Sequence, residues 1–234
     1  MTRTELLTLL DQKLRDVNAY IDESERITLL EEAVAEYNKY RPNSTLEDQS
    51  GTDDNELVLP TSWEENFSRI ITLEEVYEKG TDDESFTILE PRLYSIYEKD
   101  TGKVIRLENY TYSDYTYRIT FTVQHTLPDG ECSVPEHNCR ALLYYATSQG
   151  LLDLSTYTAQ NADHAFTGLE NVTLQRKTQS EQYYRNSEKY RQKWCEFMGI
   201  PFIPSNLISN NKLLTTHAMT RLTWNYHNAK RLLH

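Results

Sequence analysis

Apolar positions recur at helical spacing at the start of the chain. Leucine occupies every fourth position from Leu6 to Leu14, behind Thr2 and Glu5, which form a capping-box pair. This pattern predicts a first helix over residues 3–17. The residues of the pair are those that satisfy free backbone N–H groups at a helix start.

A second apolar stripe predicts another helix over residues 24–40. Its members are spaced three and four residues apart, from Ile27 to Tyr37. The helix must stop at Arg41, because Pro42 disfavours helical geometry in the residue before it. The two helices are close enough in sequence to pack as a hairpin.

Helical spacing returns after residue 130. Ser133 and Glu136 form a second capping-box pair ahead of an apolar stripe, which predicts a helix over residues 134–160. Gly150 lies inside this stripe and is expected either to end the helix or to bend it. The polar residues from Asn161 to Asp163 predict a turn.

The last helix of the body is predicted over residues 178–198. Thr178 and Glu181 are its capping-box pair, and Gly199 followed by Pro201 marks its end. The stripe of this helix is rich in aromatic residues, which is typical of a helix that packs in a bundle.

Between these helical regions, residues 44–126 alternate with a period of two. Val, Ile, Tyr, Phe and Thr become common, and Tyr117–Val123 has the clearest alternation. The turn residues Asp100–Gly102 separate two further apolar runs. The pattern predicts an antiparallel meander of five or six strands.

The fold class predicted from this order is α+β. It consists of a helical bundle of about four helices with an inserted antiparallel β region and an extended C-terminal arm. One domain is expected over residues 1–199, and the arm over residues 200–234. Such an order differs from alternating βαβ units, so a doubly wound nucleotide-binding fold is not expected.

Charge separates the arm from the rest of the chain. The 234 residues carry a net charge of −12, whereas residues 200–234 contain four basic residues and no acid, so the first 199 residues carry −16. A basic, aromatic-bearing segment on an acidic body is typical of a segment that docks on something else. The apolar content of 38% and the absence of a long apolar run predict no membrane span. The acid Glu5 lies where a signal peptide needs an uninterrupted apolar region, so we expect no secretory targeting, and either a reducing compartment or a particle assembled in cytoplasm.

Residues that could carry chemistry are few. His125, Cys132, His137 and Cys139 match no usual zinc spacing, so neither metal nor cofactor is expected and the three cysteines are assigned as free thiols. The sequence has no nucleophile elbow, Walker loop or H-E-x-x-H motif, and only 7 glycines, so no enzymatic activity is predicted. These histidines and His164 are interpreted as structural.

The arm has three interpretations. It could bind nucleic acid, because its basic and aromatic side chains can contact phosphates and stack on bases. It could fold back as a fifth helix. Its many apolar residues favour instead a partner-binding segment, whose candidate contacts are Leu213, Leu214, Met219, Arg221, Leu222, Trp224, Tyr226, Lys230 and Arg231.

Six segments in a shared order resemble the head-tail adaptor proteins of tailed bacteriophages, also called head completion or connector proteins. One further mark of the resemblance is Trp63, which follows the second segment. The segments are Ala33–Pro42, Glu56–Pro60, Ile70–Glu74, Gly102–Leu107, Tyr117–His125 and Pro135–Leu143.

The resemblance implies a virion protein assembled in the host cytoplasm, with twelve copies in a ring below the portal and an arm that contacts the portal protein. The ring would join the portal to a downstream neck or tail protein, and double-stranded DNA would pass through it. The chain departs from the family in its long β region and in an arm of more than 30 residues, which leaves the tail type open.

An acidic ring would suit a DNA conduit, because a negative wall repels passing DNA. The sequence predicts that an acidic patch, from Asp53 and Asp54 or from Asp82, Asp83 and Glu84, faces the lumen or the tail-side partner. Three alternatives remain open. The chain could be another neck or tail ring protein, such as a stopper or tail completion protein; a nucleic-acid-binding regulator; or a metal-dependent hydrolase around His125 and Cys132.

Overall fold

The computed structural model separates into two compact units. The helical unit consists of the described residues within 3–33 and 137–204, and the sheet unit of those within 34–136. The boundary falls inside one helix, between Ala33 and Val34. The residues that the structure describes are 1–15, 20–79, 83–100, 102–109, 111–163 and 170–204.

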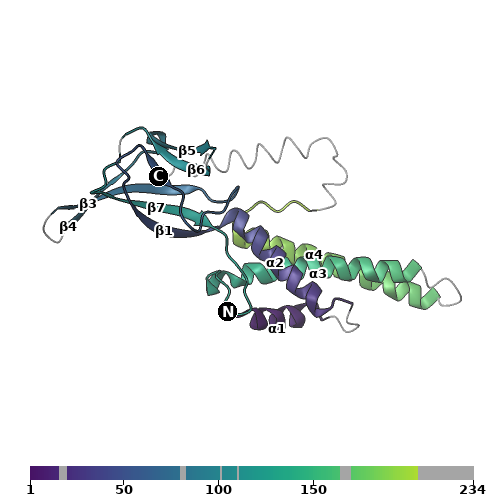
Figure 1. Cartoon of the computed structure of the whole chain (residues 1–234). Coiled ribbons are helices and arrows are strands. Elements are labelled where there is room, and N and C mark those ends of the chain that lie inside the picture. Colours follow the sequence, from purple (N-terminus) through teal and green to yellow (C-terminus); the bar gives the residue numbers. More distant parts are fainter. Residues whose placement is uncertain (16–19, 80–82, 101, 110, 164–169, 205–234) are drawn as a thin grey trace. The chain divides into compact units, whose positions relative to one another are not determined.

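The described residues contain four α-helices and antiparallel strands, as the α+β prediction requires, and the strands lie between the second and third helices in sequence (Figure 1). The helices are α1 (Arg3–Leu14), α2 (Glu23–Tyr40), α3 (Cys139–Asp163) and α4 (Glu170–Met198). The strands are β1 (Asn43–Ser50), β2 (Glu56–Val58), β3 (Ile70–Lys79), β4 (Asp83–Ile88), β5 (Tyr94–Lys99), β6 (Gly102–Leu107) and β7 (Thr116–Val123). No helix among the described residues is long and apolar enough to cross a membrane.

In the helical unit, α3 and α4 lie side by side as a hairpin (Figure 1). Serine side chains at their contact allow the two backbones to approach closely. Ser155 Oγ donates to the backbone oxygen of Ser180 at 2.9 Å, and Ser180 Oγ donates back to that of Ser155 at 2.8 Å. Nearer the other end, Tyr145 packs edge-on against Trp194, with ring centroids 5.3 Å apart.

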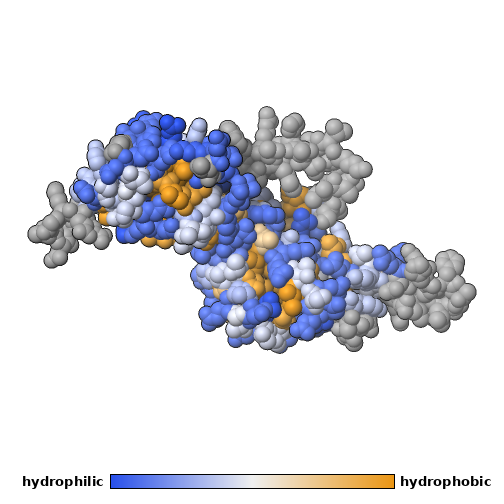
Figure 2. Space-filling model, in the orientation of Figure 1, coloured by the Kyte–Doolittle hydropathy of each residue, from blue (hydrophilic) through white to orange (hydrophobic). Residues whose placement is uncertain are grey.

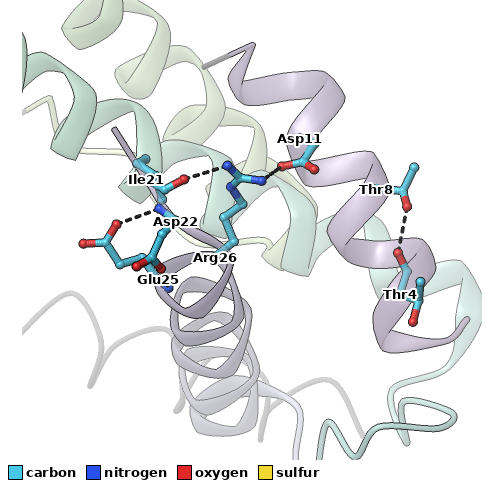
Figure 3. A network of polar contacts seen from close by, with 7 residues as sticks. All are labelled: Thr4, Thr8, Asp11, Ile21, Asp22, Glu25 and Arg26. Atoms are coloured by element: carbon cyan, nitrogen blue, oxygen red, sulfur yellow. Dashed lines mark hydrogen bonds and ion pairs between the residues drawn. The ribbon is translucent and has the colours of Figure 1, made fainter. Parts of the chain in front are cut away.

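The start of α2 is tied to α1 by Arg26 (Figure 3). Its guanidinium lies 2.7 Å from the carboxylate of Asp11 on α1 and donates to the backbone oxygen of Ile21 at 2.6 Å. Asp22 and Glu25 cap α2 reciprocally, because Asp22 Oδ1 accepts from the Glu25 N–H and Glu25 Oε2 accepts from the Asp22 N–H.

Gly150 lies within α3 and neither ends nor breaks it. A Cβ atom added at this position would lie 2.8 Å from Leu14 Cδ2 and 3.1 Å from Leu29 Cδ1. Both leucines are buried. The glycine therefore makes room for the leucines of α1 and α2 against the surface of α3.

The sheet unit contains two sheets instead of the single meander predicted. One has the strand order β1-β7-β3-β4 and the other β2-β6-β5. The hairpins β3–β4 and β5–β6 join neighbours in sequence, but β1 pairs with β7 across the whole region. This long-range pairing cannot be read from alternation, because alternation reports which face a residue occupies and not which strand lies beside it.

The core of the sheet unit lies between the two sheets. Its fully buried members come from both sheets and include Leu57, Leu73, Ile105, Leu107, Tyr117, Ile119 and Phe121. In β7 buried residues alternate with half-buried ones, so Tyr117, Ile119 and Phe121 share the inner face, as the sequence predicts.

Two predicted helix starts are wrong. α3 begins at Cys139 after a short 3-10 turn, because the Ser133 hydroxyl bonds to the backbone of Thr126 instead of capping a helix. α3 also continues to Asp163, through the residues predicted to form a turn. α4 begins at Glu170, so Thr178 lies inside it.

Candidate interaction surfaces

His125 is held in place by side chains around it in the sheet unit. Its backbone N–H donates to Asn38 Oδ1 at 2.8 Å, and Asn38 Nδ2 donates to its backbone oxygen at 3.1 Å. The ring packs edge-on against Tyr37 and lies 3.2 Å, through Nδ1, from the hydroxyl of Ser133. Burial lowers the pKa of His125, although hydrogen bonds with Ser133 and Arg41 act in the opposite direction. These contacts are those of a packed imidazole.

The other candidate metal ligands do not form a recognisable site. Cys132 and Cys139 are buried and are not joined by a disulfide, and His137 is exposed. Within the described ranges, no three His, Cys, Asp or Glu side chains are grouped as metal ligands would be. His164 lies outside the described residues. The expectation that this chain holds no metal stays a prediction.

The two predicted acidic loops differ in structure. Asp53 Oδ1 accepts from the backbone N–H of Ser113 at 2.9 Å, and hydrogen bonds with the side chain and the backbone of Ser113 lower the pKa of Asp53. The backbone oxygen of Asp54 accepts from the N–H of Thr111 at 2.7 Å. This acidic loop therefore also holds a turn of the sheet unit together, a role that its composition does not reveal.

The second acidic loop is partly a strand. Asp83 and Glu84 are the first residues of β4, paired with the end of β3, and not loop residues as predicted. Asp82 lies outside the described residues. Whether either acidic segment faces a lumen or a partner stays a prediction.

The predicted docking residues of the arm also lie outside the described residues. They are Leu213, Leu214, Met219, Arg221, Leu222, Trp224, Tyr226, Lys230 and Arg231. The described part of the arm ends at Pro204, so the arm's contacts stay a prediction from its sequence.

A cavity of about 280 Å³ opens at one end of the sheet unit's core. Glu75 and Tyr117 line it together with Asn109 and leucine side chains. The Tyr117 hydroxyl donates to Glu75 Oε1 at 2.9 Å and accepts from the Tyr112 N–H at 3.3 Å. Burial is the main cause that raises the pKa of Tyr117 to about 12. The pair gives this cavity one polar wall, which the sequence does not predict.

A larger pocket, of about 510 Å³, lies in the helical unit between α2 and α3. Its acidic lining residues are Glu25, Glu32 and Asp153, and its other walls include Leu29 and Tyr157. Burial raises the pKa of Asp153, and repulsion from Glu32 and Glu25 raises it further. No basic residue is among the lining residues, so the like charges repel one another across the pocket.

Most of the large apolar side chains that are exposed among the described residues belong to the sheet unit. Figure 2 shows apolar residues gathered in a patch on the face of this unit that the view presents. Val58 directly follows the core residue Leu57 on β2, so strand alternation is the signal that could have located it. The exposed large apolar side chains of the sheet unit are Tyr40, Leu46, Val58, Ile71, Phe86, Ile88, Ile96, Tyr97 and Tyr112.

Comparison with known proteins finds neither a family model nor a curated protein that matches this chain.

Proposed function

We propose that this chain is a structural virion protein without enzymatic activity. Copies would form a ring, of twelve by the resemblance, that connects the portal vertex of a bacteriophage capsid to its tail and lines the DNA channel. The portal protein, a downstream neck or tail protein and passing double-stranded DNA are the partners this role requires. The protein would be found at the head-tail interface of the virion.

The observation that carries the proposal is the exposure of large apolar side chains on the strands of the sheet unit. A contiguous apolar surface rimmed by polar residues is typical of a protein–protein contact. Ring proteins present two different faces to their neighbours, so such side chains are expected on more than one side of the fold.

Two further features support the same role. The order helix, helix, strands, helix, helix agrees with what the resemblance implies. The first 199 residues carry a charge of −16, which suits a wall past which DNA must move without binding. By contrast, a protein that bound DNA through its first 199 residues would need a basic surface on that part of the chain.

Imaging of the particle that contains this chain tests the proposal. We expect density for the chain between portal and tail, repeated about the tail axis. We also expect the chain to copurify with the portal protein of the same phage. A chain that instead binds double-stranded DNA with a steep salt dependence, as a monomer or dimer, would indicate the regulator. Density in another ring of the tail would indicate a stopper or tail completion protein.

A further inference from the structure

Three outward-facing side chains form an apolar row across the three-stranded sheet. Val104 on β6 is the register partner of Val58 on β2 and of Tyr97 on β5. Directly opposed side chains in antiparallel strands lie about 5 Å apart, so the three make a continuous strip. Val58 is 65% exposed and Tyr97 46% exposed, while their neighbours Leu57 and Ile105 face the core. We call Val58, Val104 and Tyr97 the apolar row.

A second apolar surface lies on the outer side of the other sheet. Phe86 and Ile88 on the edge strand β4 are 62% and 56% exposed. Their register partners on β3 are Val76 and Glu74, whose positions alternate with the core residue Leu73. We call Phe86 and Ile88 the edge pair.

The apolar row and the edge pair face in opposite directions. The core of the sheet unit lies between its two sheets, and both surfaces are on the sides turned away from that core. A copy that used both surfaces would therefore contact one neighbour on each side. This is the arrangement of a head-to-tail assembly, which closes into a ring or continues as a filament.

Charge decides which surfaces meet. On the outer side of the three-stranded sheet, Lys99 is paired with Glu56, and the remaining charge is Arg106, whose guanidinium lies 5.3 Å from the centre of the Tyr97 ring. This side has a net charge of +1 among its described strand residues. Arg106 can also form an ion pair with a carboxylate on an approaching copy, because a guanidinium stacked on an aromatic ring still offers N–H donors at its edge.

The outer side of the four-stranded sheet has the opposite charge. Arg118 and Asp48 form an ion pair with an N–O distance of 3.0 Å, which leaves Glu74 beside the edge pair and a net charge of −1 among the described side chains of this side. Row against row would bring Arg106 near a second Arg106. Edge pair against edge pair would bring two Glu74 carboxylates together. Only unlike surfaces are complementary in both apolar character and charge.

We propose that the apolar row of one copy packs on the edge pair of a second copy, with Arg106 of the first facing Glu74 of the second. This contact identifies the faces through which copies would meet in the proposed ring. Only the closure of the assembly into a ring rests on the proposed function. Self-association through these faces is a property of the chain by itself.

Crosslinking tests which surfaces meet. Tyr97→Cys and Phe86→Cys each place one accessible thiol on a different surface, whereas the three native cysteines are buried. With a short bismaleimide, an equimolar mixture of the two variants should yield crosslinked dimers, and the double variant a ladder of multimers. Each single variant alone should remain uncrosslinked, like the parent chain. Self-crosslinking of either single variant, or no crosslinks in the mixture, would overturn the proposal.

Sedimentation measures how much the contact contributes. Val58→Ser with Tyr97→Ser should weaken self-association about tenfold or more, since a tenfold change corresponds to about 1.4 kcal/mol and the variant removes two buried interface anchors. The matched control is Leu152→Ser, which removes an exposed apolar side chain from α3 and should leave self-association unchanged. Circular dichroism must show that both variants are folded. Equal effects of the folded variants would contradict the assignment of these faces.

Charge reversal supplies an independent readout. Arg106→Glu and Glu74→Arg should each weaken self-association, and an equimolar mixture of the two variants should restore it, because each then offers a charge complementary to the other. A mixture as weak as its components would overturn the pairing of Arg106 with Glu74.

Truncation distinguishes a second copy from the chain's own C-terminal segment as the occupant. A chain ending at Pro204 should crosslink through Tyr97→Cys and Phe86→Cys as the full chain does. Crosslinking that appears only after truncation would show that residues 205–234 cover these surfaces. If the full chain crosslinks as expected but fails to bind portal, the contact between copies stands and the proposed head-tail function fails. If it binds portal without these crosslinks, the proposed function stands and the contact between copies fails.

Discussion

Tyr117 joins the core of the sheet unit to the polar wall of its cavity. Its ring is buried between the sheets, while its hydroxyl donates to Glu75 at the cavity. Removal of that hydroxyl would therefore remove its hydrogen bond to the Glu75 carboxylate. A buried tyrosine usually finds a partner for its O–H, and here the partner is a carboxylate, which makes the bond stronger than one between neutral groups.

We predict that Tyr117→Phe lowers the free energy of unfolding by about 1–2 kcal/mol, because the ring still fills the core while Glu75 and the Tyr112 N–H lose a partner. Urea denaturation measures the change. Tyr184→Phe, which removes a hydroxyl from an exposed tyrosine on α4, is the control and should leave stability unchanged. Equal stability of Tyr117→Phe and the parent chain would show that water replaces this bond without cost.

Asp153 predicts a pH dependence of stability in the helical unit. Burial and the nearby Glu32 and Glu25 raise the pKa of Asp153, so the folded chain holds this proton more tightly than the unfolded chain. Ionisation of Asp153 therefore costs stability as the pH rises above the pKa of the unfolded chain. We predict that Asp153→Asn raises the melting temperature at pH 7 and that this gain disappears below about pH 4, where both states are protonated.

The control for this prediction has the opposite sign. Hydrogen bonds with Glu25 and Ser24 lower the pKa of Asp22, so the ionised cap stabilises the folded chain above the pKa of the unfolded state. Asp22→Ala should lower the melting temperature at pH 7, and the loss should shrink as the pH falls. Melting curves recorded from pH 3 to 7 test both variants, and parallel behaviour of the two would contradict the assignment.

At the scale of elements, α3 is the helix against which the rest of the helical unit is arranged. Ser155 of α3 contacts α4, and Gly150 leaves room for the side chains of Leu14 from α1 and Leu29 from α2. Glycine within a helix costs about 1 kcal/mol relative to alanine. That cost is offset here by the packing it allows.

We predict that Gly150→Ala lowers the free energy of unfolding by about 1 kcal/mol. The better helix propensity of alanine contributes about 1 kcal/mol, but crowding against Leu14 costs about 1–3 kcal/mol because the leucine is itself buried. In a Leu14→Ala background the same substitution should no longer destabilise. A double-mutant cycle by chemical denaturation measures this coupling, and an additive result would exclude the steric explanation.

At the scale of the whole molecule, the proposed neck role concerns the arm, residues 200–234. Truncation after Gly199 should leave a folded domain that no longer attaches stably to portal. Circular dichroism and copurification with the portal protein measure the two properties. Normal head-to-tail joining by the truncated chain would show that the arm is not the portal contact.

Within the arm, apolar anchors should matter more than charges. Burial of a large apolar side chain contributes about 1.5–3 kcal/mol, whereas an exposed ion pair contributes about 0–1 kcal/mol. Trp224→Ala should therefore weaken portal binding more than Lys230→Ala does, as measured by titration at fixed ionic strength. A larger effect of Lys230→Ala, with binding that falls steeply as salt is added, would favour a nucleic-acid partner instead.

The amino-acid sequence by itself determined the class of the fold and the local elements whose signals are short-range. Periodicity separates helices from strands because side chains repeat every 3.6 residues in one and every 2 in the other. The inner face of β7 and the leucine stripe of α1 follow directly from it. The starts of α3 and α4 were predicted less well, because Ser133 and Thr178 have capping chemistry but occupy positions that other contacts decide.

The tertiary structure decided what depends on residues far apart in sequence. Pairing of β1 with β7, room at Gly150 for two leucines, and the carboxylate partner of Tyr117 all join segments that no local pattern relates. The outer faces show the same division. Alternation places Val58 and Tyr97 opposite the core, but only the strand order aligns them into one row, because register arises from pairing and not from the composition of either strand.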